Sequence, residues 1–218
     1  SVPVRKKMID FKQLRKAFFN AGLTDQELSL CIPETQKHNP HMLNWLLPVL
    51  IFVLIGLIFV SVIPGSGEEP NKNLYLIFML VLLAEYLIFK YGFYNRPEKV
   101  IIMAYIFMIT TYIFGIYEAT CLGVDASGTA ICVFMVGVPL LVYDLPIRLT
   151  AMTLLVEVSL LVTYFVVNNQ LGDRFVVINS LLCTILGVSF TCGMQVTKYS
   201  DIRNRLMLER QRDTDLMT

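Results

Sequence analysis

The sequence lacks the cysteine spacing on which metal and redox sites depend. None of its five cysteines forms a C-x-x-C pair, which argues against a structural zinc site or a dithiol redox centre. We expect no metal site and free apolar thiols, with a pair between Cys121 and Cys132 as the alternative because these two flank one turn. The five are Cys31, Cys121, Cys132, Cys183 and Cys192.

Charge is also scarce. Charged residues make up 16% of the chain and hydrophobic residues 56%, with a mean hydropathy of +0.63, whereas soluble domains are about 45–50% apolar. Lys90, near the end of the second apolar block, is the only Lys or Arg inside any block. Because about 20 apolar residues cross a bilayer core, the pattern excludes a soluble domain and predicts an all-α bundle of six transmembrane helices. The blocks are 43–63, 74–93, 100–121, 123–143, 149–167 and 175–196.

Positive charge is almost absent from one side of this arrangement. Of the 18 Lys and Arg residues, only Lys72 and Arg174 fall on the side opposite the termini. Because cytoplasmic loops carry the excess of Lys and Arg, we expect both termini in the cytoplasm of a bacterial cell, with the chain in its plasma membrane. An apolar signal-peptide core is lacking after Arg5, so we expect no cleavable signal.

The segment 1–42 predicts a cytoplasmic pair of helices. Met8–Asn20 has an amphipathic pattern, and Gly22 is placed to end that helix. Thr24 and Glu27 have the spacing of a capping box for a second helix, which we expect to end or bend at Pro33. The pair lies either on anionic lipid or under the bundle, where it could also meet a cytoplasmic partner.

Three glutamates lie in apolar blocks without a cationic partner, and such groups suggest function. Glu85 and Glu157 fall near the midplane and could share a site, whereas Glu118 lies near the outer surface. Polar stripes on the third and fifth helices predict a pocket for a small cationic or amphipathic ligand from the outer side. The alternative is interhelical hydrogen bonding without a ligand. The candidate residues are Glu118, Glu157, Tyr112, Tyr117, Tyr164, Thr111, Thr153 and Glu85.

The sixth block carries small residues on one face, which allows close helix contact in lipid. That contact lies within the bundle or across a dimer axis, and we favour the dimer axis. The block continues without proline into 197–218, where a thin apolar seam predicts either a weak dimer stalk or a solvated helix end. The small residues are Ser180, Thr184, Gly187 and Thr191, and the seam residues are Tyr199, Ile202, Leu206, Glu209, Asp213 and Leu216.

The last residues carry a family resemblance. Asp215-Leu216-Met217-Thr218 resembles the D-x-L-T motif at which a signalling helix meets a GGDEF (diguanylate cyclase) domain, with Met217 in place of Leu. The N-terminal half is also similar to six-span membrane regions that precede such domains in Gram-positive bacteria. The resemblance implies a homodimeric membrane sensor for a domain that makes cyclic di-GMP from two GTP with Mg²⁺.

No catalytic motif of that family occurs in these residues, so we expect no catalytic residue and no cofactor within them. We also expect no nucleic-acid partner. The resemblance divides the chain into an N-terminal segment (1–42), a six-helix sensor (43–196) and a signalling helix (197–218). Two alternatives remain open, a transporter or channel subunit and the membrane sensor of a histidine kinase. Against transport, the sequence has no repeat between its halves.

Overall fold

The computed structural model describes residues 11–65, 71–121, 128–168 and 174–215, and every regular element among them is helical. The fold class is therefore all-α, as predicted. The elements are α1 (Phe11–Asn20), α2 (Asp25–Val62), α3 (Lys72–Ile88), the π-helix η2 (Phe89–Phe93), α4 (Pro97–Cys121), α5 (Thr129–Leu141), α6 (Pro146–Asn168) and α7 (Arg174–Asp215).

The turn between α1 and α2 follows the sequence signals. Ala21 and Gly22 adopt positive φ angles of 50° and 81°, which glycine tolerates at a helix end. Thr24 Oγ1 accepts a hydrogen bond from Glu27 N (3.3 Å), and Glu27 Oε2 accepts one from Thr24 N (2.8 Å). This is the predicted capping box. Met8, the expected start of α1, lies outside the described residues.

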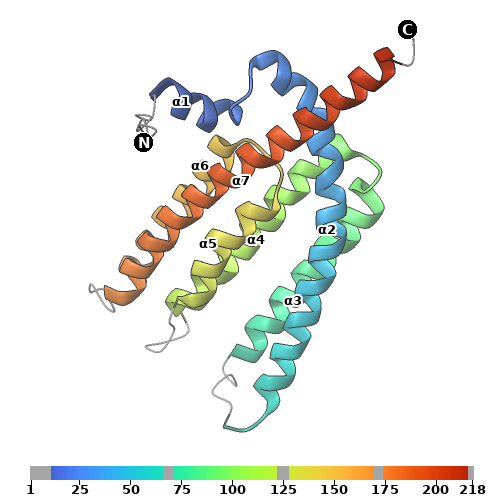
Figure 1. Ribbon diagram of the computed structural model, residues 1–218. Coiled ribbons are helices and arrows are strands. Elements are labelled where there is room, and N and C mark those ends of the chain that lie inside the picture. The colour runs from blue at the N-terminus through green and yellow to red at the C-terminus, as the bar shows by residue number, and fades with distance from the viewer. Residues whose placement is uncertain (1–10, 66–70, 122–127, 169–173, 216–218) are drawn as a thin grey trace, which may run out of the picture.

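Helix α2 does not end at Pro33, which was one of the two expectations for this segment. It continues as one helix of 38 residues that contains Pro33, Pro40 and Pro48. Each proline removes one backbone hydrogen bond, and the remaining ladder holds the helix together. Its ribbon first lies across one end of the bundle and then runs along it (Figure 1).

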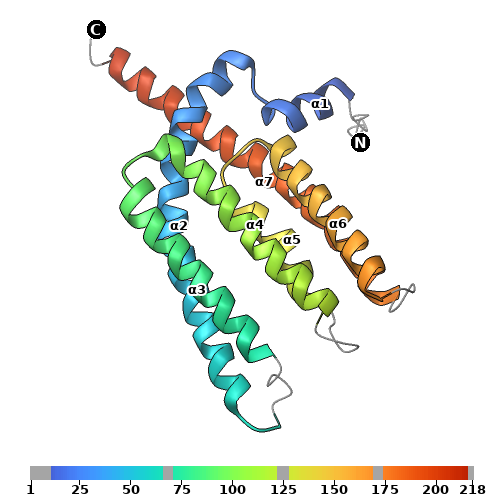
Figure 2. The same cartoon turned by 180° about the vertical axis from the view of Figure 1, so that it is seen from behind.

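The helices after α1 run alternately up and down the bundle. As a result, α1 and the last turns of α7 lie at the same end, which we call the α1 end; the opposite end is the far end (Figures 1 and 2). The α2–α3 hairpin lies close to the other helices at the α1 end and diverges from them toward the far end (Figure 2). Helix α7 is unbroken for 42 residues, as its sequence predicted.

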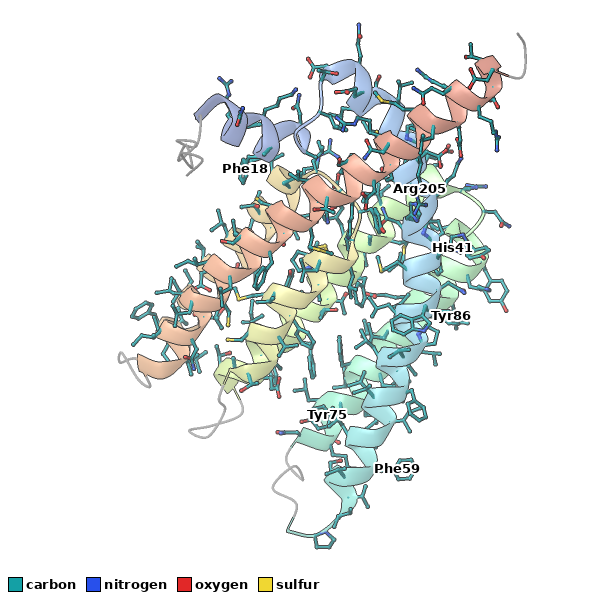
Figure 3. All side chains as sticks on the ribbon, in the orientation of Figure 1. Phe18, His41, Phe59, Tyr75, Tyr86 and Arg205 are labelled. Atoms are coloured by element: carbon teal, nitrogen blue, oxygen red, sulfur yellow. The ribbon has the colours of Figure 1, made fainter. Side chains whose placement is uncertain are left out.

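Among the residues that the structure describes, five helices are long and apolar enough to cross a membrane, and α5, with 13 residues, is shorter. At about 1.5 Å per residue α5 spans about 20 Å, less than a bilayer core of about 30 Å. Apolar side chains such as Phe59, which is 71% exposed, point outward from the bundle (Figure 3). We take residues 43–62 of α2 and 176–196 of α7 as the membrane-embedded parts of those helices.

The small-residue stripe of α7 packs inside the bundle. Ser180, Thr184 and Thr191 are at most 6% exposed. A Cβ atom added at Gly187 would lie 2.7 Å from the backbone oxygen of Met135 in α5. The preference for a dimer axis on this face is therefore corrected, because the close approach that small residues permit is made to α5 and α6 of the same chain.

Replacing Gly187 with alanine tests this contact. We expect Gly187→Ala to destabilise the fold by about 1–3 kcal/mol, because the new methyl group meets backbone that cannot move aside easily. Gly193→Ala is the matched control on the same helix: its Cβ meets no atom within 4 Å. The control should stabilise by up to about 1 kcal/mol. Thermal unfolding in detergent measures both, and equal midpoints for the two variants would contradict the packing described.

Candidate functional site

Glu157 of α6 is held by α7. Its Oε1 accepts a hydrogen bond from Ser180 Oγ and its Oε2 one from Thr184 Oγ1, each at 3.0 Å. The carboxyl is 5% exposed. Ser180 and Thr184 are one helical turn apart, so both hydroxyls reach the same carboxyl group. Glu157 thus joins two helices of one chain, which matches the alternative of interhelical hydrogen bonding.

Glu85 lies in a different helix pair. Thr110 Oγ1 of α4 donates a hydrogen bond to Glu85 Oε1. The second oxygen, Oε2, has no hydrogen-bond partner among the described residues, although Glu85 is only 6% exposed. The expected shared site for Glu85 and Glu157 is not observed, because the two carboxyls are bound by different neighbours.

The polar stripes of α4 and α6 do not form the expected ligand pocket. Thr111, Tyr112 and Thr153 are at most 2% exposed, and Tyr164 is 4% exposed. Thr111 Oγ1 donates to Phe107 O (2.8 Å) and Thr153 Oγ1 to Leu149 O (3.1 Å). The Tyr112 hydroxyl is near Thr153 without a hydrogen bond of ordinary geometry. Threonines that bond back to their own helix fit close packing.

The outer two candidates are placed differently. Tyr117 is 48% exposed and lines a groove of about 330 Å³ between α3 and α4. Glu118 is half-buried on the neighbouring position of α4. The predicted pair of Glu118 and Glu157 is therefore not brought into one pocket: Glu157 is bound by α7.

Free thiols are found at Cys31, Cys132, Cys183 and Cys192. Cys132 therefore does not pair with Cys121, whose side chain lies outside the described part of the chain. Cys132 of α5 instead contacts Cys183 of α7. No group of three or more His, Cys, Asp or Glu residues among the described residues is arranged to hold a metal ion.

The turn from α5 to α6 is held by side chains of α7. Gln195 Nε2 donates to Val142 O (2.6 Å) and Pro139 O (3.3 Å), and Lys198 Nζ donates to Leu140 O (2.6 Å). These carbonyls belong to the end of α5, where the helix itself supplies no donor. Burial lowers the pKa of the Lys198 ammonium to about 8.

Helix α2 holds the same turn from the other side. Asn39 Nδ2 donates to Tyr143 O (3.0 Å), and Asn39 Oδ1 accepts from Tyr143 N (2.9 Å). The His38 ring stacks on the Tyr143 ring with 4.9 Å between centroids, and Lys198 Nζ lies 4.0 Å from the Tyr143 centroid. The turn therefore links α2 to α7 just outside the apolar part of α7.

The first part of the predicted dimer seam is covered within the chain, whereas Glu209 and Asp213 are exposed and Leu216 lies outside the described residues. Tyr199 and Ile202 are 2% and 7% exposed, and Leu206 packs against the same cluster. Glu27 also lies 3.6 Å from Arg203 of α7. We call the residues that cover this face of α7 the N-terminal clamp. They are Ala21, Leu23, Glu27, Leu28 and Cys31.

The contacts of the N-terminal helices match one of the two placements left open for them, the one under the bundle. The start of α2 packs on α7, and α1 contacts α6 and α7. Phe18 points from α1 toward the other helices (Figure 3). Sequence reasoning missed Asn39, Gln195 and Lys198 as the groups that fix the α5–α6 turn. The available signal was Gln195 itself, a side-chain amide one position before the end of an uncharged block.

Removing the amide of Gln195 tests the hold on α5. We expect Gln195→Ala to destabilise the fold by about 1–3 kcal/mol, because two buried carbonyls lose a donor. Thr197→Ala is the matched control, since Thr197 is exposed and bonds only within α7. Unfolding midpoints in detergent compare the two, and a Gln195→Ala midpoint equal to that of the control would refute this role.

The clamp should loosen in acid. Hydrogen bonds from the Thr24 backbone N–H and hydroxyl, reinforced by Arg203, lower the pKa of the Glu27 carboxyl below its ordinary 4.5. A lowered folded-state pKa stabilises the clamp above pH 4.5, and this contribution is lost as the pH falls through the lowered value. Hydrogen exchange of residues 21–31 should therefore rise in acid, relative to intrinsic rates, in the wild type. Glu27→Gln lacks this titration, so a similar acid response in that variant would exclude Glu27 as the cause.

No protein-family profile, curated protein or solved structure matches the chain. Its function is therefore inferred from the residues that hold α7 and from the carboxylates inside the bundle.

Proposed function

We propose that this chain is the membrane sensory and dimerisation module of a signalling protein, with six crossings and both termini in the cytoplasm of a bacterial cell. Helix α7 carries the signal to an output domain, and the resemblance of residues 212–218 names that domain as a diguanylate cyclase. GTP and Mg²⁺ are then the substrate and cofactor of the output domain, and this module supplies its control.

The observation that carries the proposal is the continuity of α7. Its 42 residues form one helix from Arg174 to Asp215, about 63 Å at about 1.5 Å per residue. That is twice the bilayer core of about 30 Å. Its first half packs in the bundle, and its last turns extend beyond the other helices (Figure 1). A helix with this placement can transmit a change in the membrane to a domain in water.

The orientation is supported by charge. Arg15, Arg203 and Arg205 lie at the α1 end, and Arg205 is visible there on α7 (Figure 3). Because Lys and Arg favour the cytoplasmic side, the α1 end faces the cytoplasm in this proposal. The N-terminal clamp and the output helix then share one compartment.

The clamp supplies a means of control. Tyr199 and Ile202 are used within one chain, so two clamped copies pair only through the exposed part of α7 that includes Glu209 and Asp213. Release of the clamp exposes the whole seam to a second copy. A signal favours pairing to the extent that it binds the released state more tightly than the clamped one.

The proposal can be tested by changing the rotation of the output domain about the axis of α7. A diguanylate cyclase domain is fused after Thr218, and residues are inserted after the exposed Leu208. Two inserted residues turn the following helix by about 200°, whereas seven return it to within about 20°. We expect cyclic di-GMP synthesis to fall by about fivefold or more with two residues and to be kept with seven.

Equal activity of the two insertions would show that α7 is only a tether. The sequence encoded after Thr218 provides a separate check on the output domain. Gly-Leu followed later by G-G-[DE]-E-F is expected, and histidine-kinase motifs in that place would replace the cyclase with another output while leaving the role of α7 intact.

A further inference from the structure

The groove between α3 and α4 combines an open apolar wall with a buried carboxyl group. It has a volume of about 330 Å³, at the lower end of the range for small-molecule sites. Its walls come from one face of each helix. The lining residues are Leu74, Ile77, Phe78, Val81, Thr110, Ile113, Phe114 and Tyr117.

Glu85 lies one helical turn beyond Val81, the last α3 residue that lines this groove. Residues 74, 78, 81 and 85 recur at steps of four and three, so Glu85 continues the groove-facing side of α3 by one turn. Thr110 both lines the groove and donates a hydrogen bond to Glu85 Oε1. The carboxyl is therefore one hydrogen bond from the groove, and its Oε2 has no partner among the described residues.

Aromatic rings line the part of this groove that lies toward the far end. The α2–α3 hairpin diverges from α4 toward the far end, where Tyr75 is seen on α3 (Figures 2 and 3). Phe78 and Phe114 stack across the groove with 4.1 Å between ring centroids, and Tyr117 is 48% exposed. A ligand that enters from the far end thus meets aromatic rings first and the carboxyl last.

We propose that this groove binds an aromatic or aliphatic primary amine whose ammonium group reaches Glu85. A carboxylate without a cation is costly at this depth. An ammonium group supplies the opposite charge and a donor for Oε2, and such charge-assisted hydrogen bonds are the strong ones. The aromatic walls favour a cation as well as an apolar body. As a sensory input the site rests on the proposed function, whereas as a binding site it stands without it.

This assignment moves the expected ligand pocket from the α4–α6 interface to the α3–α4 interface. Glu157 then has a structural role through Ser180 and Thr184, and Glu85 becomes the ligand-binding carboxylate. Glu85 and Tyr117 are the two residues of the earlier prediction that belong to the new site.

The test is equilibrium binding of radiolabelled 4-phenylbutylamine to the full chain in phosphatidylcholine nanodiscs. We expect saturable binding above that of empty nanodiscs. Glu85→Gln should weaken it by about tenfold or more, because a charge-assisted hydrogen bond is lost. The matched control Glu157→Gln, also a buried carboxyl, should keep the wild-type affinity. Unlabelled 4-phenylbutanol should compete about tenfold less well than the unlabelled amine.

Val81→Phe covers the case in which Glu85→Gln fails to fold. Val81 is 40% exposed, so phenylalanine fills the groove without entering the core, and binding should be lost while the thermal midpoint is kept. The proposal is overturned by unsaturable binding, by wild-type affinity in Val81→Phe or in a folded Glu85→Gln, or by an equal loss in Glu157→Gln. If binding behaves as expected while the insertion experiment on α7 fails, the site holds and the signalling role is wrong.

Discussion

Polar groups inside an apolar bundle have few partners, and α7 supplies several of them. The end of α5 presents carbonyls that its own helix leaves unbonded, and Gln195 and Lys198 of α7 donate to them. Two hydroxyl groups on the same helix, those of Ser180 and Thr184, donate hydrogen bonds to Glu157. An unbonded polar group in such surroundings is costly. These contacts therefore fix the height and rotation of α7 against α5 and α6.

A helix fixed in this way can report on its neighbours. The turn after α5 is held by α7 on one side and by Asn39 and His38 of α2 on the other. Helix α2 also begins with the capping box that positions Glu27 against Arg203. A shift of the α2–α3 hairpin, which carries one wall of the amine groove, would thus reach α7 through α2.

Sequence patterns predicted the features that depend on local chemistry. The capping box at Thr24, the glycine turn at Gly22 and the continuity of α7 are each determined by neighbouring residues, and each is observed. Patterns of the same kind left partner choice undetermined. The stripe at Ser180 and the seam at Tyr199 show that a face is buried, but not which helix buries it. The stripe and the part of the seam from Tyr199 to Leu206 are covered within the chain. The same limit applies to the carboxylates. The sequence shows that they have no cationic partner nearby, but not which hydroxyl groups donate to them, because that depends on how each helix is rotated.

The length of the distal part of α7 would enlarge any tilt at its base. From residue 196 to residue 215 it extends about 29 Å at about 1.5 Å per residue. A tilt of about 10° where it leaves the apolar layer displaces its tip by about 5 Å, roughly half the 8–10 Å between the axes of packed helices. Angular changes too small to disturb the hydrogen bonds of Gln195 would therefore separate or join two such tips.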